Sequence, residues 1–427
     1  MKRVRLLSLV GALSLIAGVL VYFWNDWRIE RHLTTARSAL KARDPVQALT
    51  ALEAASRIDP GRGEVYFWMA RAFRRQGRLN EVRECLQGAR KRGIAKSRIQ
   101  REEWLAMAQA GQMSEVESHL SELLVNPDDD GPDICEAFAN GYMMSYRYSE
   151  AFAVVDAWQK DFPKDAQPHV FRGMVANNNS AWTTAADHFQ RAFELAPQRD
   201  DIRLQLANAL LALRSTSEAA GHFQQLLKTR PNDPEVLTGW GRTLLELGQL
   251  EKARELFTEI LKAHPKTFDA LLALGQVELN ANRLDVALPL LEQAVALDPD
   301  DSEARNALAS VLQRTGRADE ARSHFEFVAK ANEANSRIQS LREKVAQSPK
   351  DTEARFELSE LLRGNRKPAD RIKWLRSIIE IDPKHQAAHA ALAEHYEQIG
   401  DGELASKHRT QSEVLAKEKE STAKDLP

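Results

Sequence analysis

The sequence predicts an all-α solenoid built from repeated pairs of helices. Three observations indicate this fold: regularly spaced prolines, amphipathic segments of helical length between them, and small residues at fixed places inside each segment. A constant step of about 34 residues is typical of stacked repeats, in which each repeat buries its apolar face against the next. The prolines in step are Pro163, Pro197, Pro231, Pro265 and Pro299, and the same step joins Pro349 to Pro383.

The composition excludes several classes of protein. The chain has 427 residues, of which 43% are hydrophobic and 28% charged, and its formal net charge is −2. A nearly neutral chain has no general electrostatic attraction to nucleic acid, and the apolar content is ample for a folded core. Two cysteines, Cys85 and Cys135, cannot form a disulfide framework or a four-cysteine zinc site, so both are expected to be core thiols.

The first residues are predicted to form a membrane anchor. A short flank, residues 1–5, carries three basic side chains, and an uncharged run of 19 residues follows at residues 6–24. As a helix this run would be about 28 Å long, close to the roughly 30 Å hydrocarbon core of a bilayer. A cleaved signal peptide and a buried soluble helix are the alternatives. A signal peptide would need small residues where Phe23 and Trp24 stand.

The basic residues before the run predict a single-pass membrane protein with a cytoplasmic amino terminus and an extracytoplasmic domain. In a bacterium, such a protein would lie in the inner membrane with a periplasmic domain. Long domains cross a membrane largely regardless of their charge, which favours this orientation. A cytoplasm-facing domain is the alternative, because basic residues also follow the run, at Arg28, Arg31, Arg37, Lys41 and Arg43.

The residues inside each repeat agree with the period. In one repeat, Trp240 and Gly241 form a large–small pair, Gly248 marks a turn, and Ala253 and Phe257 are a small and an aromatic residue on the second helix. This pattern resembles the tetratricopeptide repeat (TPR) family, whose repeats have the same length. The resemblance implies a right-handed α-solenoid of roughly ten to eleven helix pairs after the N-terminal transmembrane helix. The predicted parts are weaker repeats at 27–163, clear repeats at 164–333, a helical insertion at 334–349, C-terminal repeats at 350–416 and a frayed tail at 417–427.

Catalytic and metal-binding patterns are missing from the sequence. His385, His389 and His395 lack the spacing and the glutamate of a metalloprotease motif, and no glycine-rich phosphate loop or nucleophile elbow occurs. We therefore expect no enzyme activity, no cofactor and no metal site. Tryptophans at helical spacing are expected to be core residues rather than stacking platforms, and they are Trp104, Trp158, Trp182 and Trp240.

The TPR resemblance implies that the first helices line a concave groove. Amide side chains can hydrogen-bond both the N–H and the C=O groups of an extended peptide, and aliphatic side chains can fill pockets for its side chains. Ordinary solvated helix faces are the alternative interpretation. The residues predicted to bind partners in the groove are Asn140, Met174, Asn177, Asn178, Leu204, Asn208, Leu211, Arg242, Leu245, Leu272, Gln276, Asn280, Asn306, Gln313 and Arg314.

The charges are segregated along the chain. Basic residues predominate between residues 62 and 101, and acidic residues predominate between residues 114 and 165. The basic segment could contact anionic lipid headgroups or an acidic partner, or the two segments could simply attract one another. The candidate basic patch consists of Arg71, Arg74, Arg75 and Arg78.

These observations predict a membrane-anchored TPR scaffold that binds protein or peptide partners. Its similarity to anchored bacterial-type TPR proteins implies a role in envelope assembly or export. Self-association through exposed end repeats is a further expectation. One alternative is a cytoplasm-facing TPR regulator of an envelope biosynthetic enzyme. An enzyme with a repeat domain is the alternative from another class, and the 16-residue insertion at 334–349 is too small to hold its active site.

Overall fold

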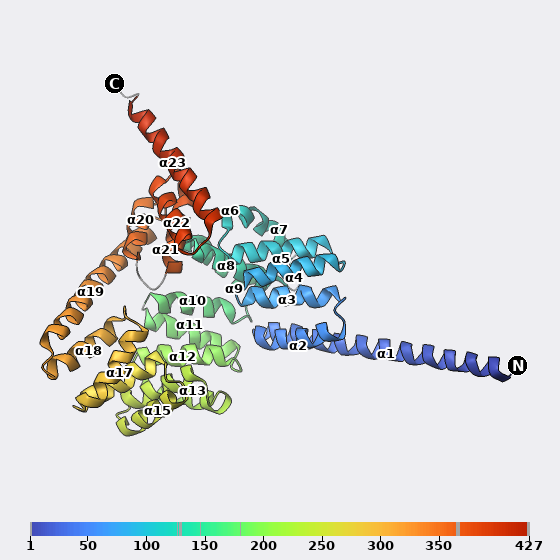
Figure 1. Cartoon of the computed structure of the whole chain (residues 1–427), viewed down its shortest axis with the longest axis horizontal. Helices are drawn as coiled ribbons and strands as arrows, with labels where there is room; N and C mark the ends of the chain where they lie inside the picture. The colour runs from blue at the N-terminus through green and yellow to red at the C-terminus, as the bar shows by residue number, and fades with distance from the viewer. Residues whose placement is uncertain are drawn as a thin grey trace. The chain divides into compact units, whose positions relative to one another are not determined.

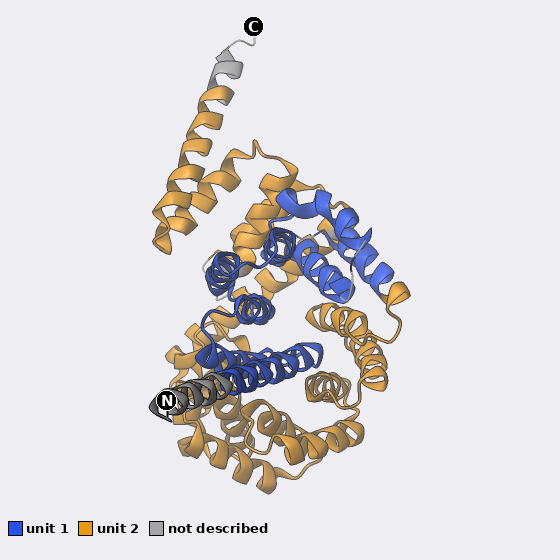
Figure 2. Ribbon diagram, turned by 90° about the vertical axis from the view of Figure 1, so that its right-hand side faces the viewer, with its two compact units in different colours: residues 1–158 blue, residues 159–427 orange. Residues whose placement is uncertain are grey.

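A computed structural model describes residues 2–125, 127, 130–145, 147–179, 181–363 and 368–424 (Figure 1). The side chains of residues 2–18, 346, 368–369 and 419–424 lie outside this description. The described residues form helices and short connections, and no strand occurs among them. The chain divides into two compact units, residues 1–158 (unit 1) and residues 159–427 (unit 2), which Figure 2 colours separately.

Unit 1 begins with the longest helix of the chain. The second half of this helix, α1, packs against α2 and α3, and Leu33, Leu52 and Val65 are fully buried between them. The helices of unit 1 are α1 (Lys2–Lys41), α2 (Pro45–Ile58), α3 (Gly63–Arg75), α4 (Leu79–Lys91), α5 (Lys96–Gln109), the short α6 (Met113–Val116) and α7 (Leu120–Val125), and α8 (Gly131–Met144). Helix α9 (Tyr148–Asp161) includes the boundary between the two units.

Unit 2 is an array of helix pairs in which each helix packs against the next, as α10 to α13 do in Figure 1. The predicted all-helical solenoid of repeated pairs is confirmed. The first helices are α10 (Gln167–Asn178), α12 (Asp200–Ala212), α14 (Pro234–Glu246), α16 (Phe268–Asn280), α18 (Ser302–Arg314), α20 (Thr352–Leu361) and α22 (Gln386–Gln398). The second helices are α11 (Trp182–Leu195), α13 (Thr216–Thr229), α15 (Leu250–Ala263), α17 (Leu284–Leu297), α19 (Ala318–Gln347), α21 (Pro368–Ile381) and α23 (Gly402–Lys424).

Small residues allow the two helices of a pair to approach closely. A Cβ atom added to Gly173 would lie 2.6 Å from the ring of Phe189, and one added to Gly241 would lie 2.5 Å from the ring of Phe257. Both phenylalanine rings are fully buried. The small residue on the first helix therefore makes room for the large residue on the second, and this contact recurs along the array.

The turn inside four consecutive pairs of unit 2 has a left-handed backbone. Gly248 and Gly316 adopt φ angles of 72° and 84°, and the equivalent residues Arg214 and Asn282 adopt 59°. These four residues follow one another at the repeat length, so the same turn closes four consecutive pairs. Glycine and, to a smaller degree, asparagine tolerate this conformation, whereas an arginine in it is strained.

Helix α19 is a single helix of 30 residues. Residues 334–347 of the predicted insertion belong to it, and Ile338, Leu341 and Val345 are buried. Helix α23 runs through the first part of the predicted tail to Lys424, and residues 425–427 lie outside the described residues. The chain after α19 thus continues with two further helix pairs.

The structure corrects the predicted membrane anchor. Among the described residues, no helix is both long enough and apolar enough to cross a membrane. The side chains of residues 6–18, most of the predicted span, lie outside the description. The described part of α1 carries the charged residues Asp26 and Arg28 before it joins the core through Ile29 and Leu33. The predicted single-pass membrane localisation is therefore wrong for the described residues.

Candidate functional site

The first helices of unit 2 lie beside one another. Contacts join α12 to α14, α14 to α16 and α16 to α18, although a second helix separates each pair in sequence. Side chains at the same position of successive first helices therefore form rows across the array. We call the side of the first helices that carries these rows the first-helix face. Its rows contain Asp201, Glu235, Asp269 and Glu303; Leu204, Thr238, Leu272 and Asn306; Asn208, Arg242, Gln276 and Ser310; and Leu211, Leu245, Leu279 and Gln313.

The predicted groove residues differ in their exposure. Leu204 and Leu272 are buried, with 3% and 2% of their surfaces exposed, so they pack between helices. Asn140 is half-buried on α8 in unit 1, so the structure does not place it with the others. The half-buried residues are Asn177, Asn208, Leu211, Leu245 and Gln276. The exposed residues are Met174, Asn178, Arg242, Asn280, Asn306, Gln313 and Arg314.

Polar bridges link neighbouring first helices at equivalent places. Nη2 of Arg242 on α14 donates to Oδ1 of Asp269 on α16 at 3.0 Å. One repeat later, Nε2 of Gln276 on α16 donates to Oε1 of Glu303 on α18 at 2.8 Å. Both bridges are exposed, so their hydrogen-bonding groups are accessible to a ligand lying across the helices.

A row of acidic residues on this face is missing from the sequence-based list of groove residues. Asp201, Glu235, Asp269 and Glu303 lie one repeat length apart in the first turns of four consecutive first helices. Carboxylates favour this position because the N-terminal end of a helix carries partial positive charge. The signal for the row was present in the sequence, since its spacing equals the repeat length.

The candidate basic patch does not form a free cationic surface. Nη2 of Arg71 donates to Oδ2 of Asp133 at 2.7 Å, Nε of Arg74 donates to Oε1 of Glu102 at 2.5 Å, and Arg75 pairs with Asp133. The side chain of Arg74 is only 2% exposed. These arginines of α3 therefore hold the acidic residues of α5 and α8 inside unit 1.

The ion pairs change the acidity of the buried carboxyl. Burial alone would raise the pKa of Asp133, but the guanidinium groups of Arg75, Arg74 and Arg71 hold its pKa well below the ordinary value. Arg78, the fourth predicted residue, pairs with Glu81 at 2.6 Å on the surface. Its side chain is 49% exposed, so this pair contributes little stability.

The histidines and cysteines have structural contacts. Nδ1 of His385 accepts from the N–H of Ala388 at the start of α22, and His389 is buried. In the part of the chain that the structure describes, no group of three or more His, Cys, Asp or Glu residues could hold a metal ion. Cys135 is buried, and burial raises the pKa of the half-buried Cys85 to about 11, which disfavours its reactive thiolate.

Comparisons with known proteins agree with the repeat pattern. One family model described as tetratricopeptide repeat matches residues 172–234, 204–266 and 238–302, and a second with the same description matches residues 39–93 and 278–345. No curated protein matches the sequence. The model matches cover helix pairs in both units.

Several solved structures match parts of the chain. TTC0263, a TPR protein from Thermus thermophilus, is 24% identical, with a TM-score of 0.36 over 46% of this chain and 99% of that chain. YrrB, described as a TPR protein with an unusual peptide-binding site, is 24% identical, with a TM-score of 0.29 over 48% of this chain and 98% of that chain. A monomeric mutant of IFIT1 is 15% identical, with a TM-score of 0.41 over 83% of this chain and 90% of that chain.

Proposed function

We propose that this chain, which contains tetratricopeptide repeats, is a protein-interaction scaffold whose first-helix face binds an extended segment of a protein partner. The repeated bridges Arg242–Asp269 and Gln276–Glu303 are the observation that supports this proposal. Each bridge offers donors and acceptors one repeat after the last, so an extended backbone could exchange hydrogen bonds with successive bridges. In this proposal the chain acts by binding a partner and not by catalysing a reaction.

The predicted role in envelope assembly or export is not part of this proposal. That role and the alternative role as a regulator of an envelope enzyme were both inferred from a membrane-anchored chain. The proposal rests instead on the geometry of unit 2, which does not depend on where the chain is located.

Site-specific photo-crosslinking tests the proposal. A photoreactive residue is placed at Asn208 or Asn280 of the full chain in cells, and at Gln293, an exposed amide on the second helix α17, as the control. We expect one partner segment to crosslink from Asn208 and, a few residues along, from Asn280, because an extended segment would cross both helices. Equal crosslinking of that segment from Gln293, or none from the first-helix face, would contradict the proposal.

A further inference from the structure

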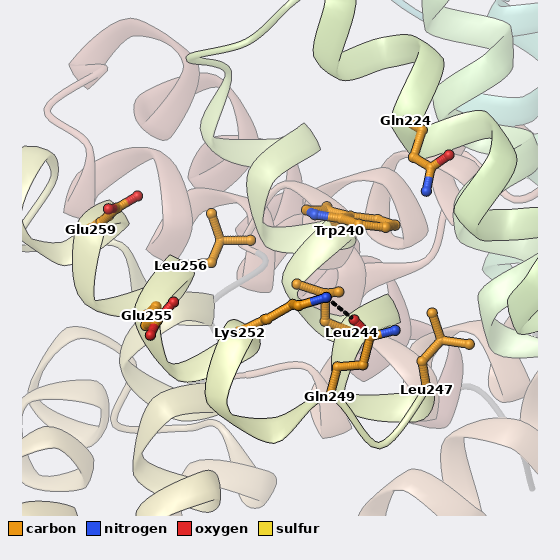
Figure 3. Close-up of a pocket in the computed structure, with 9 residues that line it drawn as sticks. All are labelled: Gln224, Trp240, Leu244, Leu247, Gln249, Lys252, Glu255, Leu256 and Glu259. Atoms are coloured by element: carbon orange, nitrogen blue, oxygen red, sulfur yellow. Dashed lines mark hydrogen bonds between the residues drawn. The ribbon is translucent and has the colours of Figure 1, made fainter.

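A cavity of about 460 Å³ lies on another side of the array (Figure 3). Trp240 and Leu244 of α14 and Leu247, the residue after this helix, line it, together with residues of the second helices α13 and α15 on either side. Trp240 precedes Arg242 by two residues, which is about 200° around a helix. The cavity and the first-helix face therefore lie on opposite sides of α14.

Trp240 departs from the pattern of its neighbours. The equivalent residues one repeat before and one and two repeats after are Leu206, Leu274 and Leu308, which are 1%, 6% and 4% exposed. Trp240 is half-buried and lines the cavity, although it was expected to be a core residue. The larger ring packs against the core and also presents an indole surface to solvent.

The glycines on either side of Trp240 allow α14 to lie close to both neighbouring second helices. A side chain at Gly239 would collide with the ring of Phe223 on α13, and one at Gly241 would collide with the ring of Phe257 on α15. Both phenylalanine rings are fully buried. Trp240 therefore lies on a helix that is closely packed on two sides, and it is itself packed against both neighbouring core clusters, so it gives the cavity an apolar floor.

Two carboxylates stand along one side of the cavity (Figure 3). Glu255 and Glu259 are exposed on α15 and lie one helical turn apart, so both face the same side. Among the described residues, neither forms an ion pair. The equivalent positions in the neighbouring repeats hold uncharged residues. They are Gly221 and Gln225 in the repeat before, and Pro289 and Gln293 in the repeat after.

One cation, Lys252, also lines the cavity. Nζ of Lys252 donates to Oε1 of Gln249 at 3.0 Å, as the dashed line in Figure 3 shows. Lys252 precedes Glu255 by one helical turn and Glu259 by two turns on α15, and its ammonium group is bonded to Gln249 rather than to either carboxylate.

We propose that this cavity is a second docking site, which receives one large apolar side chain of a protein partner that has a lysine or arginine beside it. The apolar side chain would be buried against Trp240, Leu244 and Leu256. The neighbouring cation would lie over the indole ring and near Glu255 and Glu259, where both the ring face and the carboxylates attract positive charge. An acidic partner segment is disfavoured by the same two carboxylates.

Trp240, Glu255 and Glu259 together indicate a binding site rather than a chance variation in packing. The aromatic floor and both carboxylates occur in the same repeat and line the same cavity, whereas the adjacent repeats have leucine and uncharged residues at these positions. The repeat backbone does not require any of the three, because the neighbouring pairs form the same fold without them.

The test uses the full chain with its tryptophans labelled with ¹⁵N, so that each indole gives an NMR signal. The probe is the synthetic peptide acetyl-Gly-Arg-Phe-Arg-Gly-amide, and the control peptides replace both arginines with glutamate or the phenylalanine with alanine. Trp240→Leu identifies the Trp240 signal and introduces the residue of the neighbouring repeats. We expect the probe to shift this signal and the two control peptides to leave it in place.

Variants test the charges separately. The double variant Glu255→Gln with Glu259→Gln should weaken binding of the probe by about tenfold, and Lys252→Gln should tighten it by about twofold. Glu218→Gln, on the neighbouring helix α13, and Arg242→Ala, on the first-helix face, should leave it unchanged, which separates this site from the proposed function. Equal shifts with the glutamate peptide, or unchanged binding in the double variant, would overturn the proposal. A signal that shifts on dilution of the chain alone would instead identify a second copy as the occupant, and would also overturn it.

Discussion

Nδ1 of His389 lies 3.0 Å from Nδ1 of His408, which joins the first and second helices of the last pair. Nε2 of His389 also lies 3.1 Å from the carbonyl oxygen of Pro383, six residues upstream. Since Nε2–H must donate to the carbonyl, Nδ1 of neutral His389 accepts and Nδ1–H of His408 donates. Arg203 donates in the same way to the carbonyl of Pro197, at 3.0 Å, so this link between a first helix and the preceding proline recurs.

The histidine pair predicts a stability that depends on pH. Burial first, and then the charges of His389, Lys407 and Arg376, lower the pKa of His408 from 6.5 to about 4. Because the unfolded chain binds this proton more readily, the stabilisation is complete above pH 6.5 and is lost as the pH falls from about 6.5 to 4. We expect a loss of about 1 kcal/mol after allowing for solvent screening, measured by urea unfolding at pH 7.5 and pH 4.5. His408→Gln should remove this part of the pH dependence, and an unchanged slope in that variant would refute the assignment.

The buried ion pairs of unit 1 predict a large effect of Asp133→Asn. The substitution leaves Arg71, Arg74 and Arg75 without a carboxylate that all three contact, so unit 1 should be destabilised by about 3–5 kcal/mol. The free energy of unfolding from urea titration measures the loss, and limited proteolysis should locate the new cleavage sites in unit 1. Arg78→Ala, which breaks the exposed pair with Glu81, is the control and should cost no more than about 0.5 kcal/mol. Similar losses in the two variants would argue against this account.

The left-handed turn at Arg214 predicts a stabilising substitution. Arg214→Gly places a residue without a Cβ atom at a φ angle of 59°, and should stabilise the fold by about 1 kcal/mol. Asn282→Gly is the matched control at the equivalent turn, and its gain should be smaller because asparagine tolerates this conformation better. Thermal unfolding of both variants gives the comparison, and a loss of stability in Arg214→Gly would show that its side-chain contacts matter more than the strain.

The contact between Gly241 and Phe257 predicts opposite effects of two glycine-to-alanine substitutions. Gly241→Ala places a Cβ atom 2.5 Å from a fully buried ring, and should destabilise unit 2 by about 1–3 kcal/mol. Gly221→Ala, on the exposed side of α13, meets no atom within 4 Å and should stabilise its helix by up to about 1 kcal/mol. Urea unfolding of both variants under the same conditions tests the pair. A stable Gly241→Ala variant would mean that the helices can separate without loss.

The repeat period made much of unit 2 predictable from sequence. The regular step between repeats placed the ends of the second helices near Pro197, Pro231 and Pro265, and the pair Gly241 and Phe257 was expected on facing helices. These features are predictable because each repeat uses local patterns and contacts its neighbours.

Contacts between distant residues were much harder to predict. Arg74 pairs with Glu102 and Asp133, which lie 28 and 59 residues away, whereas composition shows only that basic and acidic segments follow one another. The apolar run at residues 6–24 suggested a membrane span, because a local window does not show that α1 continues into the core around Leu33. The cavity at Trp240 was missed for a similar reason. A tryptophan at helical spacing resembles a core residue, and only comparison with the leucines at the equivalent positions of neighbouring repeats shows that it is unusual.

The length of α19 sets the orientation of the repeats after it relative to the repeats before it. Each helical residue adds about 1.5 Å and 100° of rotation, so the 16 residues of the insertion correspond to about 24 Å and a net rotation of about 160°. The pair α20 and α21 is therefore attached on nearly the opposite side of α19 from the place that a regular repeat would use. Consequently α19 acts as a spacer, and the first helices after it face a different direction from those before it.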